Sequence, residues 1–211
     1  MIILFANQKG GVGKSTLSVL FSNYLSLAKN KPVKVYDMDF QRSLYNKAQA
    51  AEVIDNEPLY PVEAAELSQF TSIQKKASNQ VSIIDLAGKM DDDELVPVFR
   101  KSDLILCPFS YDEYSVSSTI EFSFVILKIN PKAKIIFIPN RVRSSVKYET
   151  MKSVQAALKN FGVVTNSITE RIDFQRITTY DIPANIIEVI EPVFESIYNE
   201  YIDPAWHKTN T

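Results

Sequence analysis

The chain has 211 residues, which is enough for one full domain and short for two. Hydrophobic residues make up 45% and charged residues 23%, and the net charge of −2 gives no overall attraction to nucleic acid or membrane, so such binding needs a local patch. The single cysteine, Cys107, excludes a disulfide framework and a cysteine-based zinc or iron–sulfur site within one chain, and fits a reducing cytoplasm. No run approaches the roughly 18 apolar residues of a membrane span. We interpret the apolar N-terminus as a strand rather than a signal peptide.

Short apolar runs alternate with longer amphipathic stretches along the chain. The runs predict strands at residues 1–6, 33–36, 81–84, 104–107 and 133–138. The amphipathic stretches predict helices at residues 14–28, 68–77, 92–101, 115–128, 148–160 and 184–201. Because the strands are apolar almost throughout, we expect them to be buried on both faces, as in a parallel sheet. The pattern predicts a single α/β domain, 1–211, built as a three-layer sandwich with a mostly parallel central sheet and a frayed tail at 204–211.

A glycine-rich segment follows the first predicted strand and opens the first predicted helix. It overlaps the phosphate-binding pattern G-x-x-x-x-G-K-[ST], although Gln8 stands where that pattern begins with glycine. Glycines allow backbone N–H groups to point at phosphate oxygens, and the helix start is positive. We expect Lys14 to reach the β- and γ-phosphates and the Ser15 hydroxyl to ligate Mg²⁺. The predicted nucleotide contacts are Gly10, Gly11, Val12, Gly13, Lys14, Ser15 and Thr16.

The alternative for this segment is a glycine-rich turn that binds nothing. The apolar strand before it and the helix after it favour the phosphate site, because that context defines the motif. The chain has only 5 glycines, and three of them lie in this loop. The composition therefore agrees with the motif.

Carboxylates follow two of the predicted strands. Asp37 and Asp39 lie two residues apart at the end of strand 33–36, so they point to the same side, as a metal-and-water site requires. Solvated aspartates in a strand-end turn are the alternative. Asp85 ends the apolar run 81–84, which is the Walker B arrangement, and we expect it to hold Mg²⁺ through water.

The segment KGGVGKST, in which Lys9 precedes Lys14 by five residues, resembles the ParA/MinD/Soj family of deviant-Walker-A P-loop ATPases, also called SIMIBI-type. The resemblance extends from residue 1 to about residue 180. It implies ATP and Mg²⁺ as cofactors and a homodimer that forms on ATP. It also implies that Lys9 reaches the phosphates bound by the partner subunit, where its charge acts as an arginine finger does. A solvent-exposed lysine without a role is the alternative for Lys9.

The same resemblance assigns roles to residues outside the loop. Asp39, in DMDFQ where the family has D-x-D-P-Q, would place or activate the attacking water, with Asp37 nearer the metal; Phe40 replaces the usual proline. Asn140, followed by Arg141, would contact the adenine edge, with a plain turn residue as the alternative. NRVR lacks the aspartate of the guanine-specific NKxD pattern, which favours ATP over GTP. Gly88 would sense the γ-phosphate.

Comparison within the family narrows the function. The single cysteine excludes a nitrogenase-iron-protein relative, which needs two cysteines per subunit. The acidic polar positions of the C-terminal helix argue against the basic membrane helix of MinD-like proteins, so we expect no membrane binding. The first strand begins at Met1, so we expect no N-terminal helix-turn-helix domain and no operator-specific DNA binding. The remaining type is a short ParA-type ATPase.

That type predicts a cytoplasmic protein, nucleoid-associated when it binds DNA, which partitions plasmid, chromosomal or mobile-element DNA together with a ParB-like or other centromere-binding activator. The candidate residues for nonspecific DNA contact are Arg141, Arg143, Lys147, Lys152 and Lys159, with Arg171 and Arg176 nearby. A solvated helix face is the alternative for this patch. Two other functions are an assembly or positioning switch, for example for a conjugation apparatus, and a metabolic ligase. Lys9 and the DMDFQ segment argue against the ligase.

Overall fold

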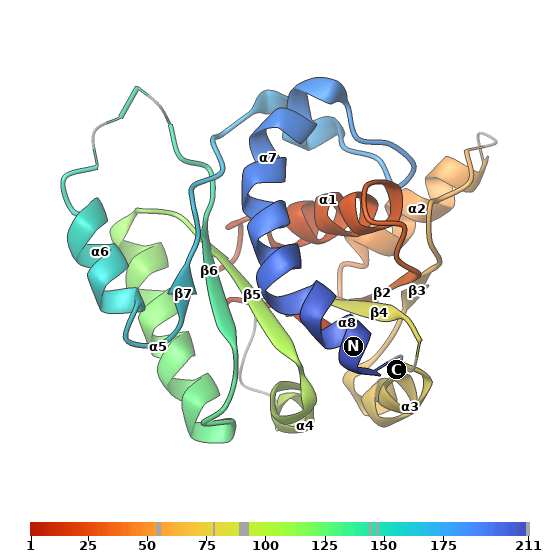
Figure 1. The fold of residues 1–211 in the computed structure, drawn as a ribbon, viewed down its shortest axis with the longest axis horizontal. Coiled ribbons are helices and arrows are strands. Elements are labelled where there is room, and N and C mark those ends of the chain that lie inside the picture. The colour runs from red at the N-terminus through yellow and green to blue at the C-terminus, as the bar shows by residue number, and fades with distance from the viewer. Residues whose placement is uncertain (54–55, 78, 89–92, 144, 147, 210–211) are drawn as a thin grey trace.

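The central sheet is parallel throughout the part of the chain that the structure describes. The computed structural model describes residues 1–53, 56–77, 79–88, 93–143, 145–146 and 148–209. Within them, seven strands form one sheet in the order β3-β2-β4-β1-β5-β6-β7, and every pairing is parallel (Figure 1). The strands are β1 (Ile2–Phe5), β2 (Val33–Met38), β3 (Val62–Ala64), β4 (Val81–Leu86), β5 (Leu104–Phe109), β6 (Ile135–Pro139) and β7 (Val163–Val164).

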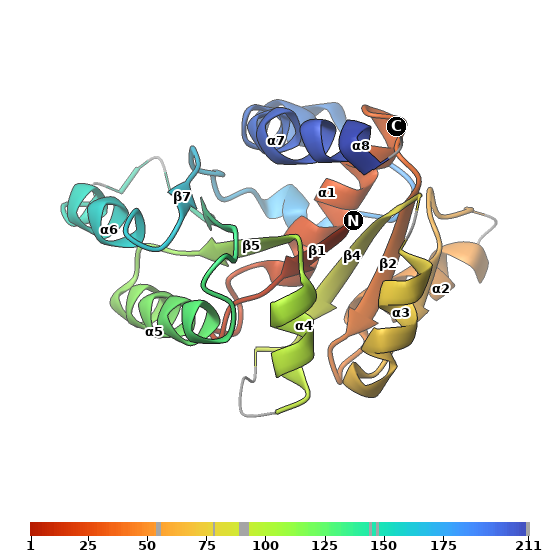
Figure 2. The ribbon, with the colours of Figure 1, turned by 60° about the horizontal axis from the view of Figure 1, so that its bottom comes forward.

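Helices cover both faces of this sheet, which makes the three layers that the sequence predicts (Figure 2). One face carries α1 (Lys14–Leu27), α7 (Ala184–Ile197) and α8 (Asp203–Thr209). The other face carries α3 (Phe70–Lys76), α4 (Leu95–Lys101), α5 (Glu113–Ile129) and α6 (Met151–Leu158). In the described part of the chain, no helix has the length and apolar character needed to cross a membrane.

The alternation of side chains along a strand explains the apolar runs. In β1, Ile3 and Phe5 belong to the core under α1 and α7, whereas Ile2 and Leu4 belong to the core under α3, α4 and α5. All four side chains are buried. Because successive residues of a strand point to opposite faces, a strand covered on both sides is apolar at most positions.

The elements that the sequence does not predict include two short strands and the helix after β2. The strands β3 and β7 have three and two residues, too few for a pattern to emerge. The helix α2 (Ser43–Val53) mixes alanines and polar residues and has few large apolar side chains, although its buried residues Leu44, Ala48 and Ala51 follow helical spacing. A tertiary contact fixes the start of α2, because the Asp37 carboxylate accepts the N–H groups of Leu44 and Tyr45, both at 3.0 Å.

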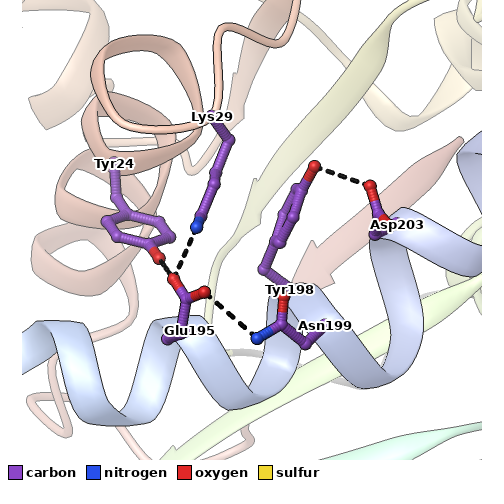
Figure 3. Close-up of polar contacts among 6 residues, drawn as sticks. All are labelled: Tyr24, Lys29, Glu195, Tyr198, Asn199 and Asp203. Atoms are coloured by element: carbon purple, nitrogen blue, oxygen red, sulfur yellow. Dashed lines mark hydrogen bonds and ion pairs between the residues drawn. The ribbon is translucent and has the colours of Figure 1, made fainter.

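The C-terminal segment is helical beyond residue 201, where the predicted helix ends. The helix α7 ends at Ile197, a π-helical turn covers Tyr198–Ile202, and α8 continues to Thr209. Glu195 ties this segment to the end of α1, because it accepts a hydrogen bond from Tyr24 and pairs with Lys29 at 2.6 Å (Figure 3). Residues 204–209 are helical in the structure, and Trp206 packs against the same core cluster as α7, while fraying of the tail stays a prediction. Residues 210–211 lie outside the described part.

Candidate nucleotide site

The glycine-rich loop joins the carboxyl end of β1 to the start of α1. Gly11 (φ 76°) and Gly13 (φ 97°) adopt the left-handed region, which glycine enters without steric cost. Gly13 is the N-cap of α1, and it has no side chain to accept the first N–H groups of the helix. An anion bound in the loop would satisfy these donors and would also meet the positive end of the helix dipole.

Asn140 holds this loop from the end of β6. Its Nδ2 donates to the Val12 carbonyl at 2.8 Å, and its side chain is buried. A Cβ at Gly13 would lie 2.3 Å from the same Nδ2, so only glycine fits there. The Oδ1 atom is buried, and no described residue donates a hydrogen bond to it. Asn140 is therefore a clamp on the loop, a role that sequence reasoning missed, and the expected adenine contact stays a prediction for its Oδ1.

Lys14 lies in the interior of the loop with only 7% of its surface exposed. Its Nζ donates to the Lys9 carbonyl at 3.2 Å. Burial lowers the pKa of the Lys14 ammonium, and the nearby carboxylates of Asp85 and Asp39 oppose this shift. The structure thus brings together three of the predicted site residues, with a cation next to two carboxylates.

Asp85, at the end of β4, is a buried carboxylate without a hydrogen-bond donor. Both of its oxygens are inaccessible, and the described residues give neither a partner of good geometry. Burial raises the pKa of Asp85 to about 7, although the nearby Ser15 side chain opposes the rise. A buried carboxylate beside a serine hydroxyl fits Mg²⁺, which prefers oxygen ligands and takes one or two from the protein. Since the described residues hold no cluster of three or more His, Cys, Asp or Glu suited to a metal, the remaining ligands would be phosphate and water.

Asp37 and Asp39 differ in what their carboxylates contact. The Asp37 oxygens accept N–H groups from Asp39, Leu44 and Tyr45, each at 3.0 Å, so this side chain anchors α2. The charge of Asp37 also acts on Asp85, and the expected place of Asp37 near the metal stays a prediction. Asp39 is partly exposed and uses Oδ1 to accept the Gln41 N–H at 2.9 Å.

Phe40 lies in the turn that follows β2. The Arg42 N–H donates to the Asp39 carbonyl at 2.9 Å, which closes the turn without the proline that is usual at position 40. The side chain of Phe40 is 83% exposed. The substitution therefore leaves a closed turn that presents a large apolar side chain beside Asp39.

Lys9 and Gly88 lie at the entrance of the loop. Lys9 is exposed, and its N–H donates to Asn7 Oδ1 at 3.0 Å. A Cβ at Gly88 would lie 3.2 Å from the Gln8 carbonyl and 3.5 Å from Lys14 Nζ, so the segment after β4 passes close to the loop. This proximity agrees with the expectation that Gly88 responds to the γ-phosphate, which stays a prediction.

A cavity of about 490 Å³ extends from the loop toward the segment 170–175, and its size is that of a small-molecule site. Its lining includes Gly13, Thr16, Asn140, Arg141, Ile172 and Phe174. A base and ribose attached to phosphates in the loop would enter this space. The cavity therefore unites the predicted phosphate contacts with the predicted adenine contacts at positions 140 and 141.

The structure places the candidate DNA-binding residues on the surface near this cavity and on α6. Arg141, Lys152 and Lys159 are exposed. Arg143 is exposed as well, but its Nε pairs with Glu170 at 2.5 Å, which reduces the local positive charge. Lys147 lies outside the described residues.

The fold and the loop define a P-loop nucleotide-binding protein. The sequence matches the CobQ/CobB/MinD/ParA nucleotide-binding domain over residues 3–184, and the chain belongs to this family. A search of curated proteins gave no match.

Solved structures share the fold over nearly the whole chain. A plasmid partition protein from Borrelia burgdorferi B31 bound to AMPPNP superposes with a TM-score of 0.71 at 24% identity, covering 95% of this chain and 98% of that one. An ATP complex of a McdA variant from Cyanothece gives 0.71 at 15% identity, covering 94% and 95%. The cell division ATPase MinD from Pyrococcus furiosus gives 0.70 at 16% identity, covering 94% and 98%. At these identities the similarity shows a shared fold and nothing more specific.

The raised pKa of Asp85 predicts a pH effect on stability. Its pKa is about 7 in the folded chain against a usual value of 3.8, so the folded state retains a proton that the unfolded state loses between these values. The associated stability is complete below the unfolded pKa and is lost as the pH rises through the folded pKa. Without Mg²⁺ or nucleotide, the free energy of unfolding of the wild type should therefore fall by about a few kcal/mol between pH 5 and pH 8. Asp85→Asn cannot titrate, so it should not show this part of the fall. Urea unfolding at both pH values measures this, and parallel pH profiles would contradict it.

Proposed function

We propose that the protein is a Mg²⁺-dependent ATPase that dimerises on ATP and drives the partition of plasmid, chromosomal or mobile-element DNA with a partner protein. The observation that carries this proposal is the pair of lysines in the loop. Lys14 is buried beside Asp85, as a phosphate-binding lysine should be, whereas Lys9 is exposed at the entrance of the same loop. An exposed cation there is available to a nucleotide held by a second copy of the chain.

The described residues fit the hydrolysis of ATP. The loop N–H groups and Lys14 bind the phosphates, and Asn140 keeps the loop in shape through Val12. Ser15 and Asp85 would hold Mg²⁺, which neutralises charge on the phosphates. Asp39 is partly exposed, and its charge acts on both Lys14 and Asp85, so it suits the placing of an attacking water. The AMPPNP bound to the Borrelia protein supports ATP as the ligand.

The exposed side chain of Lys9 would couple this site to a second subunit. Within one chain, its N–H and its carbonyl hold the loop together, and its side chain is left exposed. In a face-to-face dimer that side chain would stabilise the charge that develops on the partner's phosphates, as an arginine finger does. ATP binding and dimerisation would then be coupled, and a centromere-bound activator would stimulate hydrolysis.

DNA binding would come from the local basic surface, because the net charge of the chain is −2. We expect a nonspecific duplex to bind with ATP but neither with ADP nor without nucleotide, and to dissociate as salt rises. Removing one phosphate-contacting lysine by Lys159→Ala should lower the slope of log affinity against log salt by about 0.9. Lys75→Ala removes an exposed lysine from α3, which lies beside β2 and β4 and away from α6 (Figure 2), and should leave the slope unchanged.

A second candidate is an ATP-dependent switch that positions or assembles a complex without DNA cargo. The pairing of Arg143 with Glu170 favours it, because it weakens the basic surface. Fluorescence anisotropy of a labelled duplex, read beside light scattering of the protein, separates the two. ATP-dependent dimerisation without DNA binding would support the switch. The cytoplasm is the compartment where both functions would operate.

A further inference from the structure

Asn7 is a buried residue between β1 and the loop, and both its amide nitrogen and its amide oxygen form hydrogen bonds. Its Nδ2 donates to the Pro108 carbonyl at 2.8 Å and to Thr119 Oγ1 at 2.9 Å. Its Oδ1 accepts the Lys9 N–H at 3.0 Å. Asn7 is completely buried, so water does not compete for these three bonds. The side chain thus connects β5 and α5 directly to the backbone of Lys9.

The connection continues to the start of α5. Thr119 Oγ1 donates to the Ser115 carbonyl at 2.7 Å, and the Ser115 N–H donates to the N-cap residue Asp112 at 2.9 Å. The Ser115 hydroxyl accepts the Ser110 N–H at 3.0 Å. Asp112 lies close enough to Lys9 for the two charges to interact. One network, buried at Asn7, Ser115 and Thr119, therefore fixes the first turns of α5 and the backbone of Lys9 relative to each other.

The Lys9 peptide is held from two directions. Asn7 binds its N–H, and the Lys14 ammonium binds its carbonyl at 3.2 Å. A nucleotide that takes Lys14 for its phosphates would release the carbonyl, so Asn7 would then be the buried side chain that still holds Lys9 in place. Only an amide supplies two donors and an acceptor in this arrangement. A carboxylate at position 7 would have no N–H to donate, and its negative charge would repel the Pro108 carbonyl oxygen.

We propose that Asn7 is a positioning residue for Lys9: it fixes the loop entrance to α5 so that the Lys9 side chain stands at a defined place when a second copy of the chain approaches. The part played by Lys9 toward that second copy rests on the proposed function, whereas the fixing of its backbone does not. Because the hydrogen bonds of Asn7 go to Pro108, Thr119 and Lys9 rather than to Ser15 or Asp85, its effect should fall on dimerisation more than on ATP binding.

Four variants test this proposal. Asn7→Ala removes all three bonds, and Thr119→Val removes one acceptor while the shape of the side chain is kept. Thr119→Ser restores the hydroxyl. Ser123→Ala is the matched control, because Ser123 donates to the Thr119 carbonyl at 2.7 Å from an equally buried position one turn further along α5, away from Asn7.

Two measurements are made on each variant: hydrogen exchange of the Lys9 N–H without nucleotide, and the ATP-dependent dimer dissociation constant alongside ATP affinity. We expect Asn7→Ala to speed exchange and weaken dimerisation by about tenfold or more, as for loss of a buried hydrogen-bond partner, with ATP affinity changed by less than about threefold. Thr119→Val should show a smaller effect in the same direction. Thr119→Ser and Ser123→Ala should behave as the wild type.

Unchanged Lys9 exchange in both Asn7→Ala and Thr119→Val would overturn the proposal, and so would an equal loss in Ser123→Ala. If ATP affinity falls as far as dimerisation, Asn7 supports the whole loop and the positioning role is wrong. A wild type that does not dimerise on ATP would instead contradict the proposed function, and the exchange rates would still decide whether Asn7 holds Lys9.

Discussion

Replacing Lys14 with alanine is expected to abolish measurable ATP binding. The Lys14 ammonium is buried within the loop and lies near Asp85 and Asp39. Each hydrogen bond to a charged group contributes about 1.5–3 kcal/mol, and Lys14 is expected to reach two phosphates, so affinity should fall by about 100-fold or more. The variant also leaves Asp85 buried without its nearby cation, which raises the pKa of that carboxyl further and weakens Mg²⁺ binding.

Titration calorimetry with ATP and Mg²⁺ measures this effect, and Lys29→Ala is a matched control. Lys29 follows α1 at its far end, where it pairs with Glu195 at 2.6 Å. Its loss should lower stability and leave ATP affinity intact. ATP affinity that is unchanged in Lys14→Ala would contradict the nucleotide site itself.

The parts of this site that the sequence predicts are those that depend on neighbours along the chain. The loop, the helix after it and the carboxylate at the end of β4 each follow from a short motif. The buried strands follow from apolar runs, since a sheet covered on both faces leaves few positions for polar residues. The carboxyl ends of parallel strands share one edge, which brings Lys14 and Asp85 together.

The parts that the sequence does not reveal depend on contacts between distant segments. Asn140 meets Val12 across 128 positions, and Asn7 meets Thr119 across 112. The motif also does not reveal that the Asp37 carboxylate accepts the first N–H groups of α2, and its expected place near the metal stays a prediction. Helix α2 has few large apolar side chains among its alanines and polar residues, so the sequence shows only a weak helical pattern, and the packing of Leu44, Ala48 and Ala51 reveals its buried face. A buried asparagine has no sequence signature that separates a clamp from a turn residue.

Lys9→Ala is expected to retain ATP binding while it loses ATP-dependent dimerisation and most hydrolysis. The two contacts that Lys9 makes to its own loop use backbone atoms, the N–H toward Asn7 and the carbonyl toward Lys14, and alanine keeps both. The loss is therefore confined to the exposed ammonium. A cation supplied in trans to a phosphoryl group contributes about 10³–10⁵-fold in rate, so hydrolysis should fall by a factor in that range.

Light scattering with ATP, combined with a phosphate-release assay, tests this expectation, and Lys9→Arg is the control that keeps the charge. A mixture of Lys9→Ala and Lys14→Ala chains adds a sharper test of the trans role. Lys9→Ala chains keep an intact phosphate site, and Lys14→Ala chains keep the lysine that would reach it. The mixture should hydrolyse ATP faster than the sum of the two variants alone. If Lys9→Ala dimerises as the wild type does and the mixture gains nothing, Lys9 acts within its own chain and the coupling of ATP to dimerisation must come from other residues.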